Sequence, residues 1–554
     1  MSTIAFPLRH EPDPVLNLEG LSVAYRMPDG WRRVVHDVSF TVRSGEVVTL
    51  VGESGSGKTT TAQAVIGLLP SNGRVDAGSI RLNGTDITGW AGRRLDAIRG
   101  KVMSLVPQDP GSSLNPVRTI GAQVGEILEL HGLRDRRERQ ARVIDLLTRV
   151  GLSEPAMRAN QYPHELSGGM KQRVLIAIAV ALRPKLIIAD EPTSALDVTV
   201  QRRILDLLDE LRAETGTAVL LVTHDLGVAA DRADRILVLK DGRVQEQGPT
   251  RVLLERQESA YARRLLADAP SLLPPKQRSV LPTAEVLVRV EGLHKSFRVA
   301  GRPSVAVEDM SFSITAGTTH ALVGESGSGK TTTARCLAGF EYGESGRITV
   351  DGVRVFGLRG EALRLFRRNV QLVYQNPFTS LDPLQSIGHI VGEPLLNFER
   401  IGKVERLERV HAMLERVGLP ADSIARTARS LSGGQRQRVA IARALILKPR
   451  VLVLDEAVSA LDVTVQAQIL RLLDELQQQL GLTYLFVTHD LSVVRQIAHT
   501  VTVMQAGRAI ESGPVAEVFT HPQADYTRDL IAAIPGRGLV PRTHPSPTYA
   551  RAAE

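Results

Sequence analysis

The chain has 554 residues with a formal net charge of +8, and 43% of them are hydrophobic. This length predicts at least two domains, and the composition is sufficient for large buried cores. The single cysteine, Cys336, excludes a disulfide framework and any four-thiolate zinc or iron–sulfur site within the chain. No apolar run approaches the roughly 18 residues that a membrane span needs, and the modest positive charge is that of an ordinary solvated surface.

Residues 1–14 are polar, contain prolines and lack the apolar core of a signal peptide. We therefore expect an N-terminal tail here, and a chain that is cytosolic or attached to a membrane through partners.

The first motif is a glycine-rich loop between an apolar run at residues 47–51 and a segment of helical composition at 60–69. Residues 52–59 read Gly-Glu-Ser-Gly-Ser-Gly-Lys-Thr, and residues 324–331 repeat them letter for letter. Glycines let successive backbone N–H groups turn inward around a phosphate chain. Lys58 and Lys330 can reach the outer phosphates, while Thr59 and Thr331 can ligate Mg²⁺. The alternative is a glycine-rich turn that matches by chance, which two identical copies disfavour.

A second pattern, Leu-Ser-Gly-Gly, stands at residues 166–169 and again at 431–434. Its serine is a good helix N-cap, and its glycines free the backbone N–H groups at a helix start, which together predict a second anion site in each half. Within its own half this site has no companion. We expect it to face the phosphate loop of the other half.

Two apolar runs, residues 186–190 and 451–455, each end in an acid that is followed directly by a glutamate. The carboxyl end of a buried parallel strand is where ligands bind in open α/β sheets. Asp190 and Asp455 are therefore predicted to orient Mg²⁺ through water. Glu191 and Glu456 are predicted to polarise a water for attack on a γ-phosphate, with a pair of helix N-cap acids as the alternative.

Each half also ends an apolar strand in a histidine, His224 after residues 218–223 and His489 after 484–488. A lone histidine at such a place is more often structural. Because both are in register with the acids, we predict that each contacts the γ-phosphate.

The repeat defines the domain organisation. The two loop lysines are separated by a slightly longer stretch of chain than the matched acids or the matched histidines, so the second half lost only loop-sized pieces. We predict a tandem duplication, with a first domain at residues 15–269 and a second at 285–535. Between them, residues 270–284 are rich in proline and form a short linker. Residues 536–554 form a loose C-terminal tail.

With these motifs in this order, the chain resembles the ATP-binding cassette (ABC) ATPases over residues 15–535. The resemblance implies an α/β fold of two tandem P-loop NTPase domains. Each would have a mainly parallel core sheet, an antiparallel β subdomain and an α-helical signature subdomain. In that family two domains pair head to tail with ATP between them. This implies one site from Lys58 with Ser432 and Gly434, and another from Lys330 with Ser167 and Gly169.

The resemblance extends the candidate site beyond the catalytic Glu191, His224, Glu456 and His489. Tyr25 and Phe297 match the aromatic residue that stacks on adenine, with ordinary strand residues as the alternative. Gln108 and Gln375 match the Q-loop glutamine. The implied ATP-binding set is Tyr25, Gly52, Ser54, Gly55, Gly57, Lys58, Thr59, Thr60, Gln108, Ser167, Gly168, Gly169, Asp190, Phe297, Gly324, Ser326, Gly327, Gly329, Lys330, Thr331, Thr332, Gln375, Ser432, Gly433, Gly434 and Asp455. The implied Mg²⁺ set, partly through water, is Thr59, Gln108, Asp190, Thr331, Gln375 and Asp455.

More narrowly, the chain resembles the fused ATPase subunits of the oligopeptide, dipeptide and nickel importer group. The extended Q-loops at residues 108–116 and 375–383 and the C-terminal motif at 521–535 carry this resemblance, and Tyr261 begins a weaker first-half counterpart of that motif. Two departures, Ala457 in place of a proline and Met170 in place of a glutamine, remove no phosphate or metal ligand.

The group resemblance implies an ATP-hydrolysing subunit at the cytoplasmic face of the membrane that energises peptide uptake. Its partners would be two membrane permeases and an extracytoplasmic solute-binding protein, with no nucleic acid. The alternatives are nickel, glutathione or another small solute as cargo, a sugar importer with fused cassettes, or a soluble twin-cassette ATPase acting on ribosomes or DNA. Such soluble factors usually have a long charged linker or zinc-binding cysteines, and this chain has neither.

Overall fold

The computed structural model describes residues 14–194, 196–276, 278, 285–299, 302–375, 380–459 and 461–537. Residues 1–13 and 538–554 of the predicted tails, and residues 277 and 279–284 of the predicted linker, lie outside these residues. The chain divides into two compact units. Unit 1 comprises Met1–Leu196, Val200–Pro274 and Pro535–Glu554, and unit 2 comprises Asp197–Thr199 and Pro275–Ile534. Among the described residues, no helix is both long enough and apolar enough to cross a membrane.

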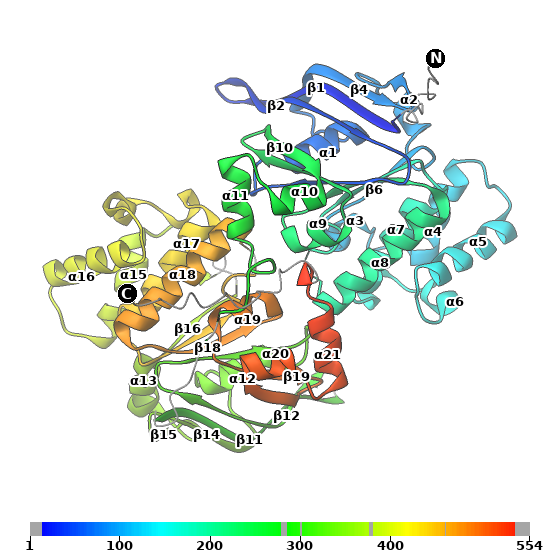
Figure 1. The fold of residues 1–554 in the computed structure, drawn as a ribbon. Helices are drawn as coiled ribbons and strands as arrows, with labels where there is room; N and C mark the ends of the chain where they lie inside the picture. The colour runs from blue at the N-terminus through cyan, green and yellow to red at the C-terminus, as the bar shows by residue number, and fades with distance from the viewer. Residues whose placement is uncertain are drawn as a thin grey trace, which may run out of the picture. The chain divides into compact units, whose positions relative to one another are not determined.

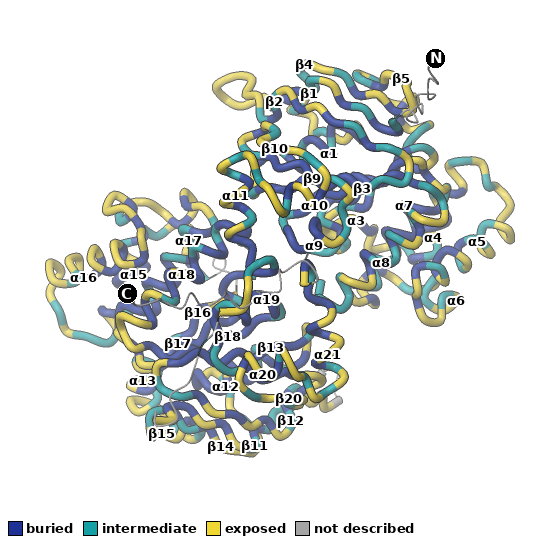
Figure 2. The backbone as a smooth tube through the Cα atoms, in the orientation of Figure 1, coloured by how far each residue is buried: buried dark blue, intermediate teal, exposed yellow. Residues whose placement is uncertain are grey.

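Unit 1 is organised around a six-stranded sheet in the order β10-β9-β3-β8-β7-β6 (Figure 1). Its strands are β3 (Val47–Val51), β6 (Met103–Val106), β7 (Leu186–Asp190), β8 (Ala218–Val222), β9 (Arg235–Lys240) and β10 (Arg243–Pro249). Neighbouring strands are parallel except β10, which pairs antiparallel with β9. Every residue of β3, β7 and β8 is buried, as expected for parallel strands that are covered on both faces. Figure 2 shows buried residues, in dark blue, gathered in the interior of each unit.

A smaller antiparallel sheet, in the order β2-β1-β4-β5, covers one side of unit 1. Its strands are β1 (Leu16–Met27), β2 (Gly30–Val42), β4 (Gly73–Leu82) and β5 (Thr85–Asp86). Leu21 and Val38 of this sheet share one hydrophobic cluster with Leu50 and Ile188 of the core sheet. Burial of these apolar side chains holds the two sheets together.

The helices of unit 1 follow the same division. They are α1 (Lys58–Ile66), α2 (Arg93–Asp96), α3 (Pro110–Ser113), α4 (Ile120–Leu130), α5 (Arg136–Arg149), α6 (Pro155–Arg158), α7 (Gly168–Val180), α8 (Val198–Thr215), α9 (Leu226–Arg232), α10 (Thr250–Glu255) and α11 (Ala260–Ala267). Helices α4 to α7 gather apart from the antiparallel sheet (Figure 1). Val124, Leu147 and Val174 from this group are buried in one cluster with Leu221 of β8. This cluster ties the helical group to the core sheet.

Unit 2 repeats this plan. Its core sheet has the order β16-β17-β18-β13-β19-β20, and its antiparallel sheet has the order β12-β11-β14-β15. The strands are β11 (Val286–Val299), β12 (Arg302–Thr315), β13 (Thr319–Val323), β14 (Ser345–Val350), β15 (Val353–Arg354), β16 (Val370–Val373), β17 (Val451–Asp455), β18 (Thr483–Thr488), β19 (Thr500–Gln505) and β20 (Arg508–Pro514).

The helices of unit 2 are α12 (Lys330–Leu337), α13 (Gly360–Asn369), α15 (Ile387–Phe398), α16 (Lys403–Arg416), α17 (Gly433–Leu445), α18 (Val463–Leu480), α19 (Leu491–Ile497), α20 (Val515–Thr520) and α21 (Asp525–Ala532). Cys336 in α12 is fully buried, and burial raises the pKa of its thiol to about 12. The predicted fold class is confirmed in both units.

The core sheet of unit 2 contains a buried histidine at a position where unit 1 has an aliphatic residue. His320 in β13 is 2% exposed, stacks on Phe312 and hydrogen-bonds the hydroxyls of Thr500 and Thr502 at 2.8 and 3.1 Å. Val48 occupies the matching position in β3, in the register that the two loop lysines define. Burial lowers the pKa of His320 to about 3, so the imidazole is neutral in the folded state.

This burial predicts an acid-sensitive unit 2. As pH falls through the usual histidine pKa, His320 binds a proton in the unfolded state but not in the folded state. Between pH 8 and pH 5 the free energy of unfolding should therefore fall by about 2 kcal/mol through this residue. In His320→Val this contribution should vanish, as measured by hydrogen exchange in peptides from β13 and β18 after correction for intrinsic rates. An unchanged pH dependence in the variant would contradict the assignment.

Candidate functional site

The phosphate loop of unit 1 joins β3 to α1. Gly52 has φ 150°, and a Cβ there would lie 2.2 Å from the carbonyl oxygen of Leu239, so no larger residue fits. Lys58 is 5% exposed, and its ammonium donates to the carbonyl oxygens of Gly52 and Glu53, both at 2.8 Å. The loop therefore curls around its own lysine at the start of α1, where backbone N–H groups attract anions.

The strand end beside the loop supplies a hydroxyl–carboxylate pair. Thr59 donates from Oγ1 to Oδ1 of Asp190 at 3.1 Å. Burial raises the pKa of Asp190 to about 6, the adjacent Glu191 charge also raises it, and the Thr59 hydrogen bond and the Lys58 charge act against them. A buried carboxylate of this kind gains from a nearby cation.

Glu191 lies at the centre of the polar site. Its Oε2 accepts from Nε2 of Gln108 at 2.8 Å, and its Oε1 lies 3.0 Å from Nδ1 of His224. Its backbone is left-handed, with φ 45°, a rare conformation for a side chain of this size. Such strain is retained where the surrounding contacts over-determine it, which is common at functional sites.

The charges of this site are coupled. Burial raises the pKa of Glu191, but the His224 hydrogen bond and the charges of His224 and Lys58 outweigh it, so the net pKa is lowered. The same hydrogen bond raises the pKa of His224. Glu191 is thus held ionised, the state in which a carboxylate can accept a proton or orient water.

Unit 2 contains the same constellation. Lys330 donates to the carbonyl oxygens of Gly324 and Glu325, both at 2.8 Å. Thr331 donates to Asp455 at 3.0 Å, and burial raises the pKa of that aspartate.

The second glutamate is also placed as the first. Glu456 accepts from Gln375 at 2.7 Å, lies 3.4 Å from Nδ1 of His489 and has φ 48°. The structure therefore brings together, in each unit, the predicted loop lysine, threonine, glutamine, acid pair and histidine.

The two Leu-Ser-Gly-Gly patterns begin α7 and α17. Ser167 and Ser432 are the N-caps, as predicted, and each hydroxyl accepts from the backbone N–H three residues on, at 3.4 and 3.3 Å. In unit 2 the side chain of Gln435 also accepts from the Ser432 N–H at 3.1 Å, which completes a capping box. Met170 stands at the matching position of unit 1 and cannot accept in this way.

The second glycine of each pattern is required by packing. A Cβ on Gly169 would lie 2.6 Å from Cγ1 of Val200, and one on Gly434 would lie 2.4 Å from Cγ1 of Val465. The predicted pairing of each signature serine with the loop of the other half stays a prediction.

The two candidate adenine-stacking residues stand at matched places in β1 and β11. The Tyr25 hydroxyl lies 3.4 Å from Oγ1 of Thr60, so this ring is next to the loop helix. Phe297 is 38% exposed, with the Lys295 ammonium 5.0 Å from its ring centroid. Their role toward a base stays a prediction.

Sequence reasoning missed one matched pair of contacts. The hydroxyls of Tyr261 and Tyr526 each accept from the backbone N–H of the second loop residue, Glu53 or Glu325, at 3.3 Å. Tyr526 belongs to the C-terminal motif, and Tyr261 begins its weaker first-half counterpart. Tyr261 and Tyr526 are separated along the chain by the same number of residues as the two acid pairs, and this match is the only sequence signal for the shared contact.

The donor set also bears on the metal. Among the described residues, no group of three or more histidine, cysteine, aspartate or glutamate side chains could form an all-protein metal site. Thr59 with Asp190, and Thr331 with Asp455, offer hard oxygen atoms beside a phosphate loop. Mg²⁺ is typically held by one or two such groups together with phosphate oxygens and water, so these residues fit that ion.

Comparison with known proteins agrees with this geometry. The model of the "ABC transporter" family matches residues 35–194 and 307–459. The chain is 44% identical to the peptidoglycan transport ATP-binding protein YejF of Agrobacterium fabrum, over 94% of this chain and 96% of that protein. It is 41% identical to the oligopeptide transport ATP-binding protein OppD of Mycobacterium tuberculosis, over 94% of this chain and 98% of that protein. It is 40% identical to the glutathione import ATP-binding protein GsiA of Escherichia coli O157:H7, over 94% of this chain and 89% of that protein.

The site predicts the effect of neutralising either glutamate. Glu191→Gln and Glu456→Gln keep the shape of the side chain but remove the carboxylate that orients water. Each should reduce phosphate release from ATP, and the double variant should lose about 100-fold or more, while equilibrium binding of ATP persists. Glu138→Gln on the exposed face of α5 is the matched control. Wild-type turnover in either single variant would show that its site is not catalytic as argued.

Proposed function

The chain belongs to the ABC transporter family, and we propose that it is the ATP-hydrolysing subunit of an importer that takes up peptides through separate membrane permeases. As a member of this family it binds and hydrolyses ATP. The importer assignment draws on relatives that align over nearly the whole chain and are named for transport of peptidoglycan, oligopeptides and glutathione. Because these cargoes share peptide bonds, a peptide or peptide-like solute is the best-supported cargo. Nickel or another small solute is the alternative within the same group.

The observation that carries the proposal is the doubled site. In each unit a strained glutamate is held between a glutamine and a histidine, one residue after the acid that accepts from the loop threonine. Both halves keep every one of these groups. A fused sugar importer with one degraded site is less consistent with this.

The chemical roles follow from the contacts. Lys58 and Lys330 would exchange the loop carbonyls for the outer phosphates of ATP. Glu191 and Glu456 would orient the attacking water, and His224 and His489 would donate to the γ-phosphate. Mg²⁺, held through Thr59, Asp190 and their counterparts, would neutralise phosphate charge. Participation of Gln108 and Gln375 in that site, and completion of each site by the opposite signature, are expectations from the family resemblance.

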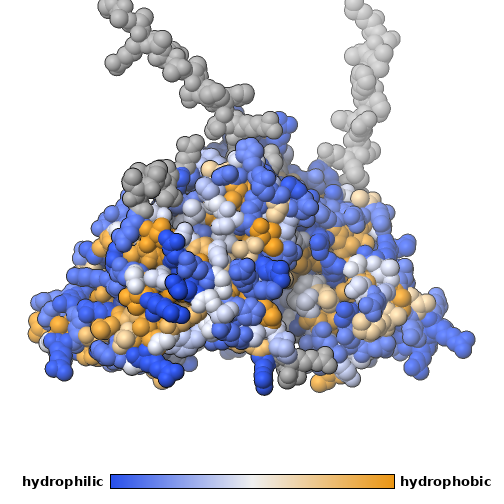
Figure 3. All heavy atoms as spheres, turned by 90° about the horizontal axis from the view of Figure 1, so that it is seen from below, coloured by the Kyte–Doolittle hydropathy of each residue, from blue (hydrophilic) through white to orange (hydrophobic). Residues whose placement is uncertain are grey.

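The permease contact is proposed at two matched apolar residues. Val117 and Leu384 are 78% and 76% exposed, and they match each other in the same register as the two Q-loop glutamines. Each lies just before the N-cap of a helix, Thr119 of α4 or Ser386 of α15. Isolated exposed apolar residues are ordinary, and Figure 3 shows them scattered among hydrophilic ones. The matched position shortly after a Q-loop glutamine distinguishes these two.

We propose two permeases, an extracytoplasmic solute-binding protein and a location at the cytoplasmic face of the membrane. The rival class is a soluble twin-cassette ATPase on ribosomes or DNA, which requires no permease.

Purification of the tagged chain from detergent-solubilised membranes of its own host tests this proposal. Permeases should co-purify, and cells should take up peptide in a manner that depends on the chain. Val117→Asp and Leu384→Asp should each weaken permease recovery about ten-fold or more by placing a charge in an apolar contact, with basal ATP hydrolysis unchanged. Val404→Asp, at an equally exposed residue of α16, is the control. Recovery of ribosomes without permeases would contradict the transport assignment.

A further inference from the structure

Helices α11 and α21 each place a tyrosine against the phosphate loop of their own unit. Tyr261 is the second residue of α11, and Tyr526 is the second residue of α21. Each hydroxyl accepts from the backbone N–H of the second loop residue at 3.3 Å. The contact is made twice, in the same register, between elements that are far apart in the chain.

The loop residue that the tyrosine contacts is also the one that the lysine contacts. The carbonyl oxygen of Glu53 accepts from Lys58, and that of Glu325 accepts from Lys330, both at 2.8 Å. The N–H and the C=O of one residue are therefore held from two sides. Burial raises the pKa of Tyr526 to about 12, so its hydroxyl stays protonated and uncharged near the loop glutamate.

We propose that Tyr261 and Tyr526 are positioning residues that hold each phosphate loop in its nucleotide-binding shape. They act through the loop backbone and do not touch the reacting atoms. This inference rests on the proposed function in one respect, that ATP is the ligand of the loop. It assigns a role to the C-terminal motif of each half.

The test removes only the hydroxyls. In Tyr261→Phe/Tyr526→Phe, the KM for ATP should rise about three- to ten-fold, the value of one neutral hydrogen bond, with kcat within two-fold of wild type. Tyr342→Phe is the matched control because its hydroxyl donates to the Leu358 carbonyl at 3.1 Å, away from the loop. Thermal unfolding of the double variant should match that of the control.

The outcomes separate the two claims. If the wild-type chain does not bind ATP at equilibrium, the proposed function fails. If it binds ATP and the double variant binds equally well, the positioning role is wrong. A rise in KM that is accompanied by matching losses of kcat and thermal stability would also overturn it, because that result indicates general damage to the fold.

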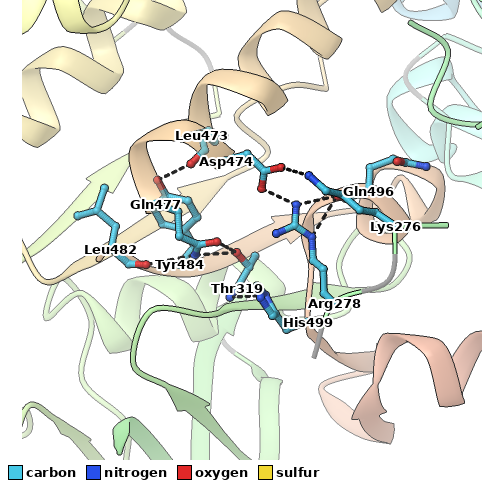
Figure 4. Close-up of polar contacts among 10 residues, drawn as sticks. All are labelled: Lys276, Arg278, Thr319, Leu473, Asp474, Gln477, Leu482, Tyr484, Gln496 and His499. Carbon is cyan, nitrogen blue, oxygen red and sulfur yellow. Dashed lines mark hydrogen bonds and ion pairs between the residues drawn. The ribbon is translucent and has the colours of Figure 1, made fainter. Parts of the chain in front are cut away.

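Two basic residues of the predicted linker contact helix α18 of unit 2. Lys276 and Arg278 both form ion pairs with Asp474 of α18 (Figure 4). Arg278 also donates to the Gln496 carbonyl at 3.1 Å, and the Lys276 backbone N–H donates to the Arg495 carbonyl at 3.1 Å. The side chains of Arg278 and Asp474 are only 10% and 16% exposed. Desolvated pairs of this kind are costly to break from one side.

In unit 1, the acid at the matching position pairs with a cation from a different element. Asp209 of α8 matches Asp474 in the register of the two acid pairs, and it accepts from Arg232 of α9 at 2.8 Å. The residue that matches Arg232 in unit 2 is Ile497, which is 1% exposed. Unit 1 thus pairs this acid with an arginine of its own helix layer, and in unit 2 the linker supplies the cation.

The acceptor lies on a rigid part of unit 2. The Tyr484 hydroxyl donates to the carbonyl of Leu473, next to Asp474, at 2.9 Å. One turn along α18, Gln477 donates to Thr319 and to the Leu482 carbonyl, both at 3.1 Å (Figure 4). The helix face that receives the linker is therefore fixed to the core sheet by buried hydrogen bonds.

We infer that Lys276 and Arg278 anchor the linker to unit 2, with Asp474 as the receptor. These residues then belong structurally to the second unit and not to a free tether.

Limited digestion of the full chain with trypsin tests this anchor. Lys276 and Arg278 are the only trypsin sites between residues 270 and 284. Asp474→Asn should release both side chains and speed cleavage there about ten-fold or more, because proteolysis follows the population of the open form. The cuts are read by mass spectrometry as new N-termini at residues 277 and 279.

Asp209→Asn is the control, since it makes the same change at the matched position, where the partner is Arg232. It should leave linker cleavage at the wild-type rate. Equal cleavage of wild type and Asp474→Asn, or equal acceleration by Asp209→Asn, would overturn the anchor.

Discussion

Two adjacent carboxylates stand at the end of a fully buried strand, Asp190 and Glu191 in unit 1 and Asp455 and Glu456 in unit 2. Charges in such a place require partners, because burial alone favours their neutral forms. The surrounding elements supply those partners. In unit 1 these are a threonine from the start of the loop helix, a glutamine just after the strand on one side, and a histidine just after the strand on the other. The order of strands in the core sheet therefore brings polar partners to one pair of acids and holds the glutamate of each pair ionised.

The sequence predicted those elements whose information is local. Short motifs indicate the backbone structure of the residues that form them. Examples are a glycine-rich loop before a lysine, an apolar run before an acid, and a serine before two glycines. Their repetition at a nearly constant spacing identified both units. The acids and His224 followed from these signals, whereas the fold class and the role of Gln108 followed from the family resemblance that the motifs carry.

Other parts of the site depend on contacts between distant segments. Nothing near Glu191 in the sequence indicates φ 45°, and the Gln108 and His224 side chains that contact it come from other segments of the chain. The contact of Tyr261 with the loop was equally hidden, since most of unit 1 separates the two groups along the chain. His320 shows the same limit, because a histidine inside an apolar strand gives no sign that Thr500 and Thr502 will satisfy both of its nitrogens.

Because a linker arginine takes the place of Arg232 in unit 2, the boundary at which the second cassette is expressed alone decides whether Asp474 keeps its ion pairs. A gene fragment for the second cassette that starts at Glu285, where its first strand is about to begin, would leave Asp474 without its cations. A fragment that starts before Lys276 would keep them. The first cassette contains its own cation for this acid, whereas the second takes its cations from residues of the predicted linker.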